Sequence, residues 1–388
     1  MISMLAVFVT ACTSGTPATG LSSQEDSGAV PTRVAPVEPI VMALTPADRA
    51  ADVAPGEPVT VRTTNGTLGE VRLTGQDGRQ VSGQFSRDGV SWQSSEPLGY
   101  GKTYTTTATG RGIDGGTTTV TSTFTTVRPA RQVALSMNPL NGQTVGVGQP
   151  LAFYFSAAVP DRAAVERAIR IDTEPVVEGA FRWFNDKEVH WRPRDFWRSG
   201  TKVTVNATIY GKNLGNNGYG KEDRTATITI GDKVVVRADG GSRQMTVEVN
   251  DQPVRTIPIS MGKPGHETPT GTYVVMTEQR DYTMDSSTYG VPADSAGGYR
   301  TKVDVASRMS NSGIFYHSAP WSVRDQGSRN VSHGCINMST ENARWMQQIG
   351  NKGDIIIVEN SGGAPLESWD GFGDWQIPWE QWIAGGKG

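Results

Sequence analysis

Two stretches decide the fold class of this 388-residue chain: TYTTTATG (residues 103–110) and TTTVTSTFTTV (117–127). In both, β-branched or aromatic side chains recur in alternation, and the RGIDGG between them supplies the Gly and Asp residues of a hairpin turn. The same pattern occurs upstream in VTVRTT (59–64) and EVRLTG (70–75), with further NG, DG and GG pairs as turn signals. Short alternating strands at regular spacing predict a mainly β chain that begins with a β-sandwich.

An internal repeat predicts a second sandwich after the first. WQSSEPLGYG (92–101) and WRPRDFWRSG (191–200) both place Gly nine residues after Trp, and an alternating strand follows each Gly. We therefore predict two successive domains, residues 39–128 and 129–231. Neither contains the Cys pair of antibody domains, so the likeness to an immunoglobulin fold is one of architecture. The second also contains DRAAVERAIR (161–170), whose apolar spacing predicts a helix.

Composition and charge narrow the function classes. A formal net charge of -3 gives no reason to expect a nucleic-acid partner. The 46 Gly and 22 Pro residues indicate a chain rich in turns and poor in helix. Apart from the N-terminal stub, no apolar run approaches the length of a membrane-spanning helix.

The N-terminal segment MISMLAVFVTACTSG (1–15) contains an apolar run that leads into Val-Thr-Ala-Cys. Small residues before a cysteine resemble a bacterial lipobox, in which a signal peptidase cuts ahead of Cys12 and the thiol is lipidated. We therefore predict a lipoprotein signal segment (1–12), an anchor on the outer face of the cytoplasmic membrane, and a flexible tether (13–38). Because the first residues lack Lys and Arg, a start-site artefact is the alternative.

A third domain is predicted over residues 232–360. It opens with DKVVVRADGGSRQMTVEVNDQPVRTIPISMG (232–262), which predicts two or three strands joined by Gly-Gly and Asn-Asp turns. Near its end, STENARWMQQIG (339–350) predicts a helix with a Ser or Thr cap, and DIIIV (354–358) predicts a buried strand.

The C-terminal tail, residues 361–388, holds four tryptophans within fourteen residues: Trp369, Trp375, Trp379 and Trp382. Such a cluster serves either as a platform for carbohydrate or the membrane interface, or as a cover for hydrophobic surface between domains. We favour the second use, in which the tail packs on the other domains, because burial of aromatic rings is strongly stabilising.

Cys335 is the one thiol left if Cys12 is lipidated, since the chain has two cysteines. Without a partner in its own chain, it is a reactive thiol, half of an intermolecular bridge or a buried inert residue. Two of the four histidines lie near it, His333 two residues before and His317 eighteen residues before. An adjacent imidazole is the usual device that activates a thiol. Because GIFYH (313–317) predicts a strand that ends beside the Cys loop, we assign His317 as the base and His333 as a positioning residue.

The surroundings of Cys335 complete a candidate acyl-transfer site. Gly334 lets the backbone approach closely, so the amides of His333, Gly334 and Cys335 are candidates for an oxyanion hole. The carbonyl of Ser318 is the candidate that orients the imidazole of His317. A zinc site is the rival use, but the spacing H-x15-H-x-C matches no common zinc pattern, and we predict no metal or other cofactor.

The segment HSAPWSVRDQGSRNVSHGCIN (317–337) resembles the catalytic signature of the L,D-transpeptidases, the YkuD family. A second segment, GKPGHETPTGTY (262–273), is similar to the Gly-Lys and Thr-Pro-Thr-Gly segment of that family. The resemblance covers residues 232–360. Two sandwiches ahead of this domain, a Trp-rich tail behind it and Ser318 after the upstream His resemble the mycobacterial and actinobacterial members.

The resemblance implies an enzyme that cross-links peptidoglycan between the third residues of two stem peptides. Cys335 would attack the bond between meso-diaminopimelate and the terminal D-Ala of a tetrapeptide donor, and the side-chain amine of a second diaminopimelate would resolve the acyl-enzyme. His317 would transfer the proton, and the amides of Gly334 and Cys335 would stabilise the oxyanion. Carbapenems would acylate Cys335, because the same nucleophile meets a strained β-lactam amide.

The resemblance also implies the substrate contacts. The polar, Gly-rich and aromatic composition of QRDYTMDSSTYGVPADSAGGYR (279–300) suits a mobile lid over the site, and an ordinary surface loop is the alternative. The lid residues that would face the substrate are Met284, Tyr289 and Tyr299. The other implied contacts are Ser312, Trp321, Ser332 and Asn337.

Chain order separates other thiol enzymes from this one. Papain-like and NlpC/P60 hydrolases place Cys before His, and the sortase motif Thr-Leu-x-Thr-Cys with its downstream Arg is missing here. Two alternatives remain: a lipid-anchored module that binds the cell wall through a degenerate site, and an L,D-carboxypeptidase that hydrolyses the same bond without cross-linking.

Overall fold

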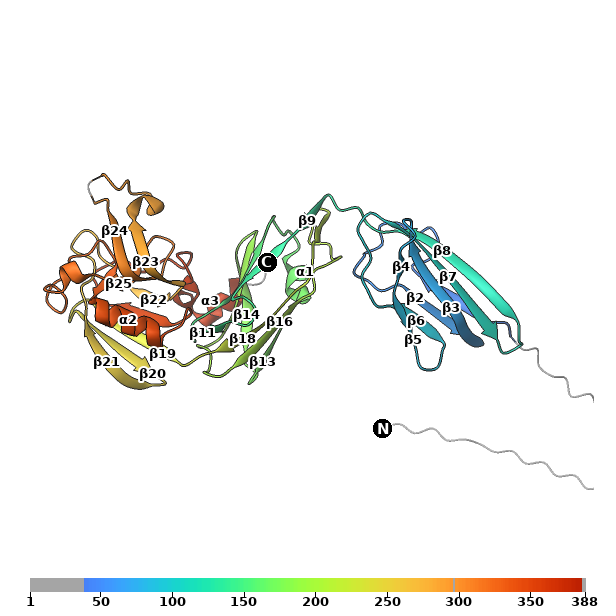
Figure 1. The fold of residues 1–388 in the computed structure, drawn as a ribbon, viewed down its shortest axis with the longest axis horizontal. Coiled ribbons are helices and arrows are strands. Elements are labelled where there is room, and N and C mark those ends of the chain that lie inside the picture. Colours follow the sequence, from blue (N-terminus) through green and yellow to red (C-terminus); the bar gives the residue numbers. More distant parts are fainter. Residues whose placement is uncertain (1–37, 296, 386–388) are drawn as a thin grey trace, which may run out of the picture.

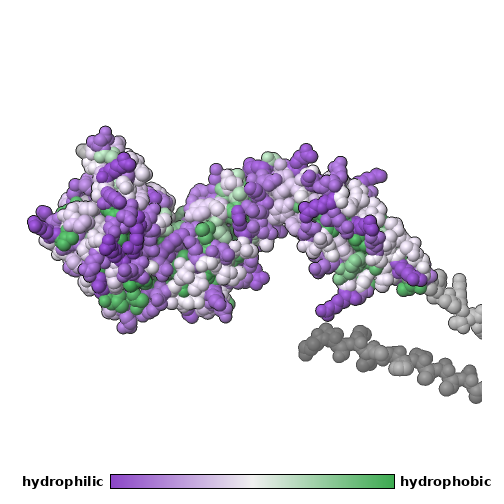
Figure 2. Space-filling view, viewed as in Figure 1, coloured by the Kyte–Doolittle hydropathy of each residue, from purple (hydrophilic) through white to green (hydrophobic). Residues whose placement is uncertain are grey.

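The computed structural model describes residues 38–295 and 297–385. The predicted signal segment with Cys12, and the predicted tether up to residue 37, lie outside the described residues. The described chain forms three bodies in a row, two β-sandwiches followed by a larger domain (Figure 1). Hydrophilic side chains cover most of the face shown in Figure 2, with small hydrophobic patches on each body. None of the helices in the described part of the chain is long and apolar enough to cross a membrane.

The first body contains two four-stranded sheets. One has the strand order β1 (Val41–Thr45), β2 (Thr60–Thr64), β6 (Ser91–Ser94) and β5 (Gly83–Phe85). The other has the order β4 (Gln80–Val81), β3 (Gly66–Gly75), β7 (Thr103–Gly112) and β8 (Thr117–Thr125). Every second side chain of β7 is buried, in a core that includes Leu73, Trp92 and Phe124. The alternation that predicts the sandwich is therefore the alternation of core-facing side chains.

The second body is also a sandwich of two four-stranded sheets, and its second sheet has a different edge strand. Its first sheet has the order β10 (Leu135–Asn138), β12 (Leu151–Phe155), β15 (Glu188–Pro193) and β14 (Gly179–Asn185). Its second sheet has the order β11 (Thr144–Val145), β18 (Arg224–Ile230), β16 (Lys202–Ala207) and β13 (Ile169–Glu174). A separate two-stranded parallel sheet pairs β9 (Arg131–Val133) with β17 (Gly218–Gly220). The predicted helix is α1 (Arg162–Ala168), capped by Asp161. Ile169, expected in that helix, begins β13 instead.

Both sandwiches place a tryptophan ring over a glycine of the neighbouring strand. Trp92 in β6 covers Gly83 in β5, and Trp191 in β15 covers Gly179 in β14. A Cβ atom at either glycine would lie 2.0 Å from the ring. The glycine nine residues after each tryptophan has a positive φ, 61° in one sandwich and 79° in the other, which glycine adopts without strain. The sequence repeat thus marks a structural repeat of both core and turn.

The third body contains a five-stranded and a four-stranded sheet. The five-stranded sheet has the order β21 (Gln252–Pro258), β20 (Gln244–Val249), β19 (Val234–Asp239), β27 (Ile355–Glu359) and β22 (Gly271–Val274). The four-stranded sheet has the order β23 (Thr277–Asp285), β24 (Arg300–Arg308), β25 (Phe315–Ser318) and β26 (Ile336–Met338). The predicted helix is α2 (Thr340–Ile349), which packs on β24 and β25. Ser339 caps it, as the sequence predicts, and Ala343 and Met346 are buried.

Tyrosine side chains join the two sandwiches. The hydroxyl of Tyr100 donates to the carbonyl of Gly220 (2.5 Å) and accepts from the amide of Gly211 (2.9 Å). From the second sandwich, Tyr210 donates to the carbonyl of Leu98 (2.5 Å), and its ring centroid lies 5.1 Å from that of Tyr100. This contact is small and polar compared with a domain core.

The C-terminal tail joins the second sandwich to the third body (Figure 1). It contains a short 3-10 helix (Gly373–Gln376) and α3 (Trp379–Gly385). The indoles of Trp375 and Trp382 donate to backbone carbonyls of the second sandwich, at 2.8 Å and 2.9 Å. The guanidinium of Arg192 lies 4.5 Å from the centroid of each of these rings. The tail therefore covers surface between domains, as favoured from the sequence, while Trp369 stays exposed.

A buried charge cluster fixes the tail to β15. The imidazole of His190 donates through Nδ1 to Asp374 (2.9 Å) and through Nε2 to Glu188 (3.1 Å). Burial opposes the charged imidazole, but the two carboxylates raise the pKa of His190 to about 9. His190 is therefore protonated at neutral pH and bridges the sandwich to the tail.

Candidate active site

Two parallel strands of the four-stranded sheet bring His317 and Cys335 together. In the pairing of β25 with β26, Tyr316 lies opposite Ile336 and His317 opposite Asn337. Cys335 immediately precedes β26, so the thiol and the imidazole face one cavity of about 260 Å³. The lining residues are Met284, Tyr299, Thr301, His317, Trp321, Ser322, Asp325, Val331, Ser332, His333, Cys335 and Asn337.

Cys335 is a buried, neutral thiol. Its side chain belongs to a small hydrophobic cluster with Met284, Val303 and Phe315. Sγ donates to the carbonyl of Gly313 at 3.5 Å. Burial raises the pKa of the Cys335 thiol to about 11. At pH 7 Cys335 is therefore predominantly the neutral thiol.

His317 is a buried, neutral imidazole with a fixed tautomer. Its Nδ1 lies 3.0 Å from the carbonyl oxygen of Ser318, the partner predicted from the sequence. Because a carbonyl only accepts, Nδ1 carries the proton and Nε2 is the basic nitrogen. Burial lowers the pKa of His317 to about 4, opposed by the Ser318 carbonyl and the Asn337 side chain. At neutral pH Nε2 of His317 is therefore unprotonated and able to accept a proton.

Ser332 closes the turn that carries Cys335. Its Oγ donates to the carbonyl of Cys335 (2.6 Å) and accepts from the amide of Gly334 (3.1 Å). In this structure the Gly334 amide, predicted for the oxyanion hole, is bonded to the hydroxyl of a serine two residues earlier. Of the three predicted amides, those of His333 and Cys335 remain candidate donors.

Thr268 fixes the peptide group that carries the Cys335 amide. Its fully buried hydroxyl donates to the carbonyl of Gly334 (2.7 Å) and accepts from the amide of Gly262 (3.1 Å). A trans peptide directs its carbonyl and its N–H to opposite sides. Since Thr268 holds the Gly334 carbonyl, the N–H of Cys335 points away from Thr268. The Thr-Pro-Thr-Gly segment therefore supports the Cys loop.

Six residues predicted for the site line the cavity beside the catalytic pair: Met284, Tyr299, Trp321, Ser332, His333 and Asn337. The Trp321 ring lies 5.9 Å from the His317 ring, centroid to centroid. Asn337 donates from Nδ2 to the hydroxyl of Ser322 (3.1 Å). Its Oδ1 is buried and has no hydrogen-bond partner among the described residues.

Two predicted substrate contacts have other roles. The hydroxyl and the amide of Ser312 both donate to the Asp370 carboxylate, at 2.5 Å and 2.8 Å, because the tail folds back over this loop. The Tyr289 ring packs over Gly313, where a Cβ atom would lie 2.6 Å from it, and faces Phe315 at 6.1 Å. Neither side chain lines the cavity. Both support the segment whose carbonyl, that of Gly313, accepts a hydrogen bond from the Cys335 thiol.

The segment predicted as a lid is shorter than residues 279–300. β23 continues through Asp285 and pairs with β24, so the prediction of a loop is wrong for residues 279–285. This strand is largely exposed on both faces, and its polar composition hides it from a pattern search. The remaining tip begins with a 3-10 helix (Ser286–Tyr289) and returns at Tyr299, whose amide donates to Ser286 Oγ (2.8 Å). Figure 1 shows this hairpin projecting from the third body.

Sequence reasoning missed several residues of the site. Thr268 and Lys263 both come from the Gly-Lys and Thr-Pro-Thr-Gly segment, whose likeness to a family motif was the available signal. The amide of Lys263 donates to the carbonyl of Ser332 (3.0 Å), a contact across 69 residues that no local pattern encodes. The cavity-lining residues that carried no signal are Thr301, Ser322, Asp325 and Val331.

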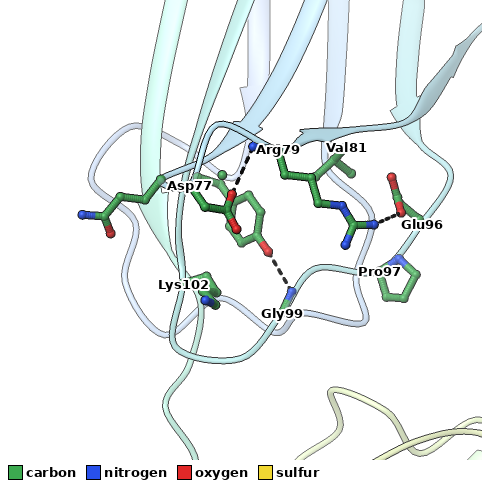
Figure 3. Close-up of a pocket in the computed structure, with 10 residues that line it drawn as sticks. Asp77, Arg79, Val81, Glu96, Pro97, Gly99 and Lys102 are labelled. Carbon is green, nitrogen blue, oxygen red and sulfur yellow. Dashed lines mark hydrogen bonds and ion pairs between the residues drawn. The ribbon is translucent and has the colours of Figure 1, made fainter.

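A larger cavity, of about 540 Å³, lies on the first sandwich (Figure 3). In this cavity Arg79 Nη2 pairs with Glu96 (3.0 Å), and the Arg79 amide donates to Asp77 (3.1 Å). Its lining contains neither a thiol nor an imidazole. The nucleophilic chemistry of the described chain therefore belongs to the smaller cavity at Cys335.

Comparison with known proteins gives the family. The L,D-transpeptidase catalytic domain family (YkuD) matches residues 233–358, and the bacterial Ig domain family matches residues 50–213, which span parts of both sandwiches. The chain is 46% identical over 338 residues to L,D-transpeptidase 2 of Mycobacterium tuberculosis, across 87% of this chain and 83% of that protein. The chain belongs to the L,D-transpeptidase family. The resemblance carried by residues 262–273 and 317–337 is thereby confirmed.

Other members show the same relationship. L,D-transpeptidase 5 of Mycobacterium tuberculosis is 37% identical over 347 residues, across 87% of this chain and 75% of that protein. Among solved structures, the LD transpeptidase LdtMt1 in complex with imipenem superposes with a TM-score of 0.52 at 39% identity, across 60% of this chain and 100% of that one. This L,D-transpeptidase is a cysteine-dependent acyltransferase.

Proposed function

We propose that this L,D-transpeptidase forms 3-3 cross-links in peptidoglycan, between the diaminopimelate residues of two stem peptides. The observation that carries the proposal is the neutral Cys335 thiol and the oriented His317 imidazole, which face one cavity from paired strands of an L,D-transpeptidase domain. The acyl donor is a tetrapeptide stem that ends in D-Ala, and the acceptor is the side-chain amine of diaminopimelate on another stem.

The acyl-enzyme forms in two steps. Nε2 of His317 removes the thiol proton as Sγ of Cys335 bonds to the diaminopimelate carbonyl carbon, and the carbonyl electron pair moves onto oxygen. The Cys335 amide stabilises this oxyanion. When the carbonyl re-forms, the C–N bond breaks, the imidazolium gives its proton to the departing amine, and D-Ala leaves with a thioester on Cys335.

Cross-linking reverses these roles. The acceptor amine attacks the thioester carbon and transfers a proton to His317, then the C–S bond breaks and the thiolate recovers that proton. The products are an amide between two diaminopimelate residues and the free enzyme. When water replaces the amine, the same steps hydrolyse the donor, which is the L,D-carboxypeptidase side reaction.

Proton transfer must accompany attack rather than precede it. The pKa values of about 11 for Cys335 and about 4 for His317 differ by about seven units, so forming the ion pair in the empty site costs on the order of 10 kcal/mol before the attraction between the two ions. The bound donor lowers this cost, because bond formation at carbon consumes the developing thiolate. Acylation therefore depends on a correctly placed carbonyl.

Intact-protein mass spectrometry with a carbapenem tests the nucleophile. We expect one covalent adduct on the wild-type protein and none on Cys335→Ala, because a β-lactam amide presents the same carbonyl to the same thiol. Muropeptide products made from a tetrapeptide donor test the transfer itself, with a 3-3 linked dimer and free D-Ala as the expected products. A folded wild-type protein that forms neither adduct nor dimer would refute the proposed function.

We also propose that the chain is a lipoprotein on the outer face of the cytoplasmic membrane, where peptidoglycan is accessible. The support is the small-residue segment before Cys12 and the length of the polar segment after it. Metabolic labelling with a fatty acid, beside Cys12→Ser, tests the anchor. A labelled wild-type protein and an unlabelled, released variant are expected, and equal labelling of both would refute lipidation at Cys12.

A further inference from the structure

A lysine and two histidines meet at the mouth of the Cys335 cavity. Nζ of Lys263 lies 3.1 Å from Nε2 of His333, a residue of the cavity lining. An ammonium only donates, so Nε2 accepts and the His333 ring is neutral, with its proton on Nδ1. The ring of His266 meets that of His333 edge-on, with centroids 5.0 Å apart. The cluster thus presents one fixed cation flanked by two imidazoles.

The positive charge of Lys263 has no carboxylate to balance it. None of the ion pairs among the described residues includes Lys263. The nearest acid in sequence, Glu267, uses Oε1 to accept from the amide of Gly265 at 2.9 Å. With a single bond to His333, the ammonium keeps two further N–H donors for a ligand.

The backbone holds this cation in place beside the nucleophile. The amide of Lys263 donates to the carbonyl of Ser332 (3.0 Å), and the amide of Ser332 donates to the carbonyl of Met261 (2.9 Å). At Gly262, an added Cβ atom would lie 1.9 Å from the carbonyl oxygen of His266, so the turn is closed as tightly as a glycine permits. The lysine loop and the Cys335 loop are therefore one rigid unit.

We propose that Lys263, with His333 and His266 beside it, is the subsite that binds a carboxylate of the donor stem peptide. The inference rests on the proposed function and adds the group that the enzyme recognises. The terminal carboxylate of D-Ala is the favoured ligand, because it lies only two bonds from the scissile nitrogen and the cluster begins two residues before the nucleophile. The side-chain carboxylate of diaminopimelate is the other source of the same chemistry.

Such a subsite selects the donor. A tetrapeptide stem has its free carboxylate next to the scissile amide, whereas a stem extended by one residue has a neutral amide there. A charge-assisted hydrogen bond lost from a partly buried site corresponds to about 10-fold to 100-fold in kcat/KM. The cluster would therefore make the enzyme prefer tetrapeptide donors by about that factor.

The test measures kcat/KM for donor turnover by wild type, Lys263→Gln and Lys263→Arg, with each protein given three donors. One tetrapeptide has both carboxylates free, one carries a C-terminal carboxamide, and one carries an amidated diaminopimelate carboxylate. We expect wild type and Lys263→Arg to prefer the free C-terminal acid over its carboxamide about 10-fold or more. We expect the ratio for Lys263→Gln to fall toward one. If Lys263→Gln instead loses the preference for a free over an amidated diaminopimelate carboxylate, the subsite binds that carboxylate.

Two controls separate the possible failures. Alkylation of Cys335 by iodoacetamide, which carries no carboxylate, and thermal unfolding show whether Lys263→Gln keeps its fold and its thiol. Wild-type protein that turns over none of the three donors contradicts the proposed function itself. If the wild type turns the donors over, and Lys263→Gln shows the same ratios of kcat/KM between the free and amidated donors, only the carboxylate subsite is refuted.

Discussion

Replacing Thr268 with valine probes how the fold aims the nucleophilic loop. Valine keeps the shape of threonine but lacks the hydroxyl, so the carbonyl of Gly334 and the amide of Gly262 both lose a buried partner. Each unsatisfied buried group costs about 1–3 kcal/mol. We therefore expect Thr268→Val to lower the free energy of unfolding by about 2–6 kcal/mol.

The same change should slow acylation of Cys335. Without the Thr268 hydroxyl, the Gly334–Cys335 peptide is free to rotate, and the N–H of Cys335 no longer has a fixed direction. Complete loss of one oxyanion donor costs about 10²- to 10³-fold in kcat. Because the amide is misdirected rather than removed, we expect a decrease of about 10-fold to 100-fold in the rate constant for acylation.

Thr268→Ser is the matched control for this measurement. Serine keeps the hydroxyl and loses one methyl group, so it should acylate within a few-fold of wild type despite a loss of about 1 kcal/mol in stability. The assay is the rate of carbapenem adduct formation, followed by mass spectrometry at a temperature where all three proteins are folded. Folded Thr268→Val that acylates at the wild-type rate, or Thr268→Ser that is as slow as the valine variant, would refute the reasoning.

Four further predictions concern stability. The buried thiol of Cys335 has a pKa of about 11, against 9.0 for a free group, so it ionises at a higher pH in the folded protein than in the unfolded chain. The free energy of unfolding, measured with urea, should therefore fall as the pH rises from about 9 to 11, and Cys335→Ala should reduce that fall. The buried imidazole of His317 has a pKa of about 4, against 6.5 for a free group, so it is protonated at a lower pH in the folded protein than in the unfolded chain. The free energy of unfolding should therefore fall by on the order of 3 kcal/mol as the pH drops from about 6.5 to 4. The same fall in His317→Gln would contradict this. Asp374→Asn leaves the charged His190 with one carboxylate and should cost about 3–5 kcal/mol in urea unfolding, whereas a cost below about 1 kcal/mol would show that the imidazole is neutral. Gly179→Ala forces a Cβ into the tryptophan ring 2.0 Å away and should lower the unfolding free energy by about 1–3 kcal/mol or more, and an unchanged value would mean that the ring moves freely.

Local patterns were sufficient for much of the fold. The alternation along β7 in the sequence is the alternation of buried side chains in the structure. The cap of α2 at Ser339 and its buried residues follow from helical spacing alone. The oriented base also followed from local chemistry, because the carbonyl of Ser318 is the next group along the chain from His317. In each case the partners are a few residues apart or the pattern has a fixed period.

The missed features all depend on contacts between distant parts of the chain. Ser312 was expected at the substrate but pairs with Asp370, 58 residues later. The hydroxyl of Thr268 reaches Gly334 across 66 residues, and His190 meets Asp374 across 184. Neither periodicity nor propensity specifies such pairs. A motif resemblance marks that a segment matters but not which atom it holds.

Because its thiol is neutral, Cys335 has low reactivity until an acyl donor binds. The thiolate is the form that oxidises and alkylates, and burial keeps Cys335 mainly in its neutral form at pH 7. No second cysteine lies in the described part of the chain to rescue an oxidised Cys335 as an internal disulfide. Burial therefore protects the Cys335 thiol from oxidation in the oxidising compartment that the proposed lipid anchor implies. Activation then falls to the substrate, because only a carbonyl placed against Sγ lets His317 take the proton as the new bond forms. The same burial that makes Cys335 a poor target for peroxide makes it selective for acyl donors that fit the cavity.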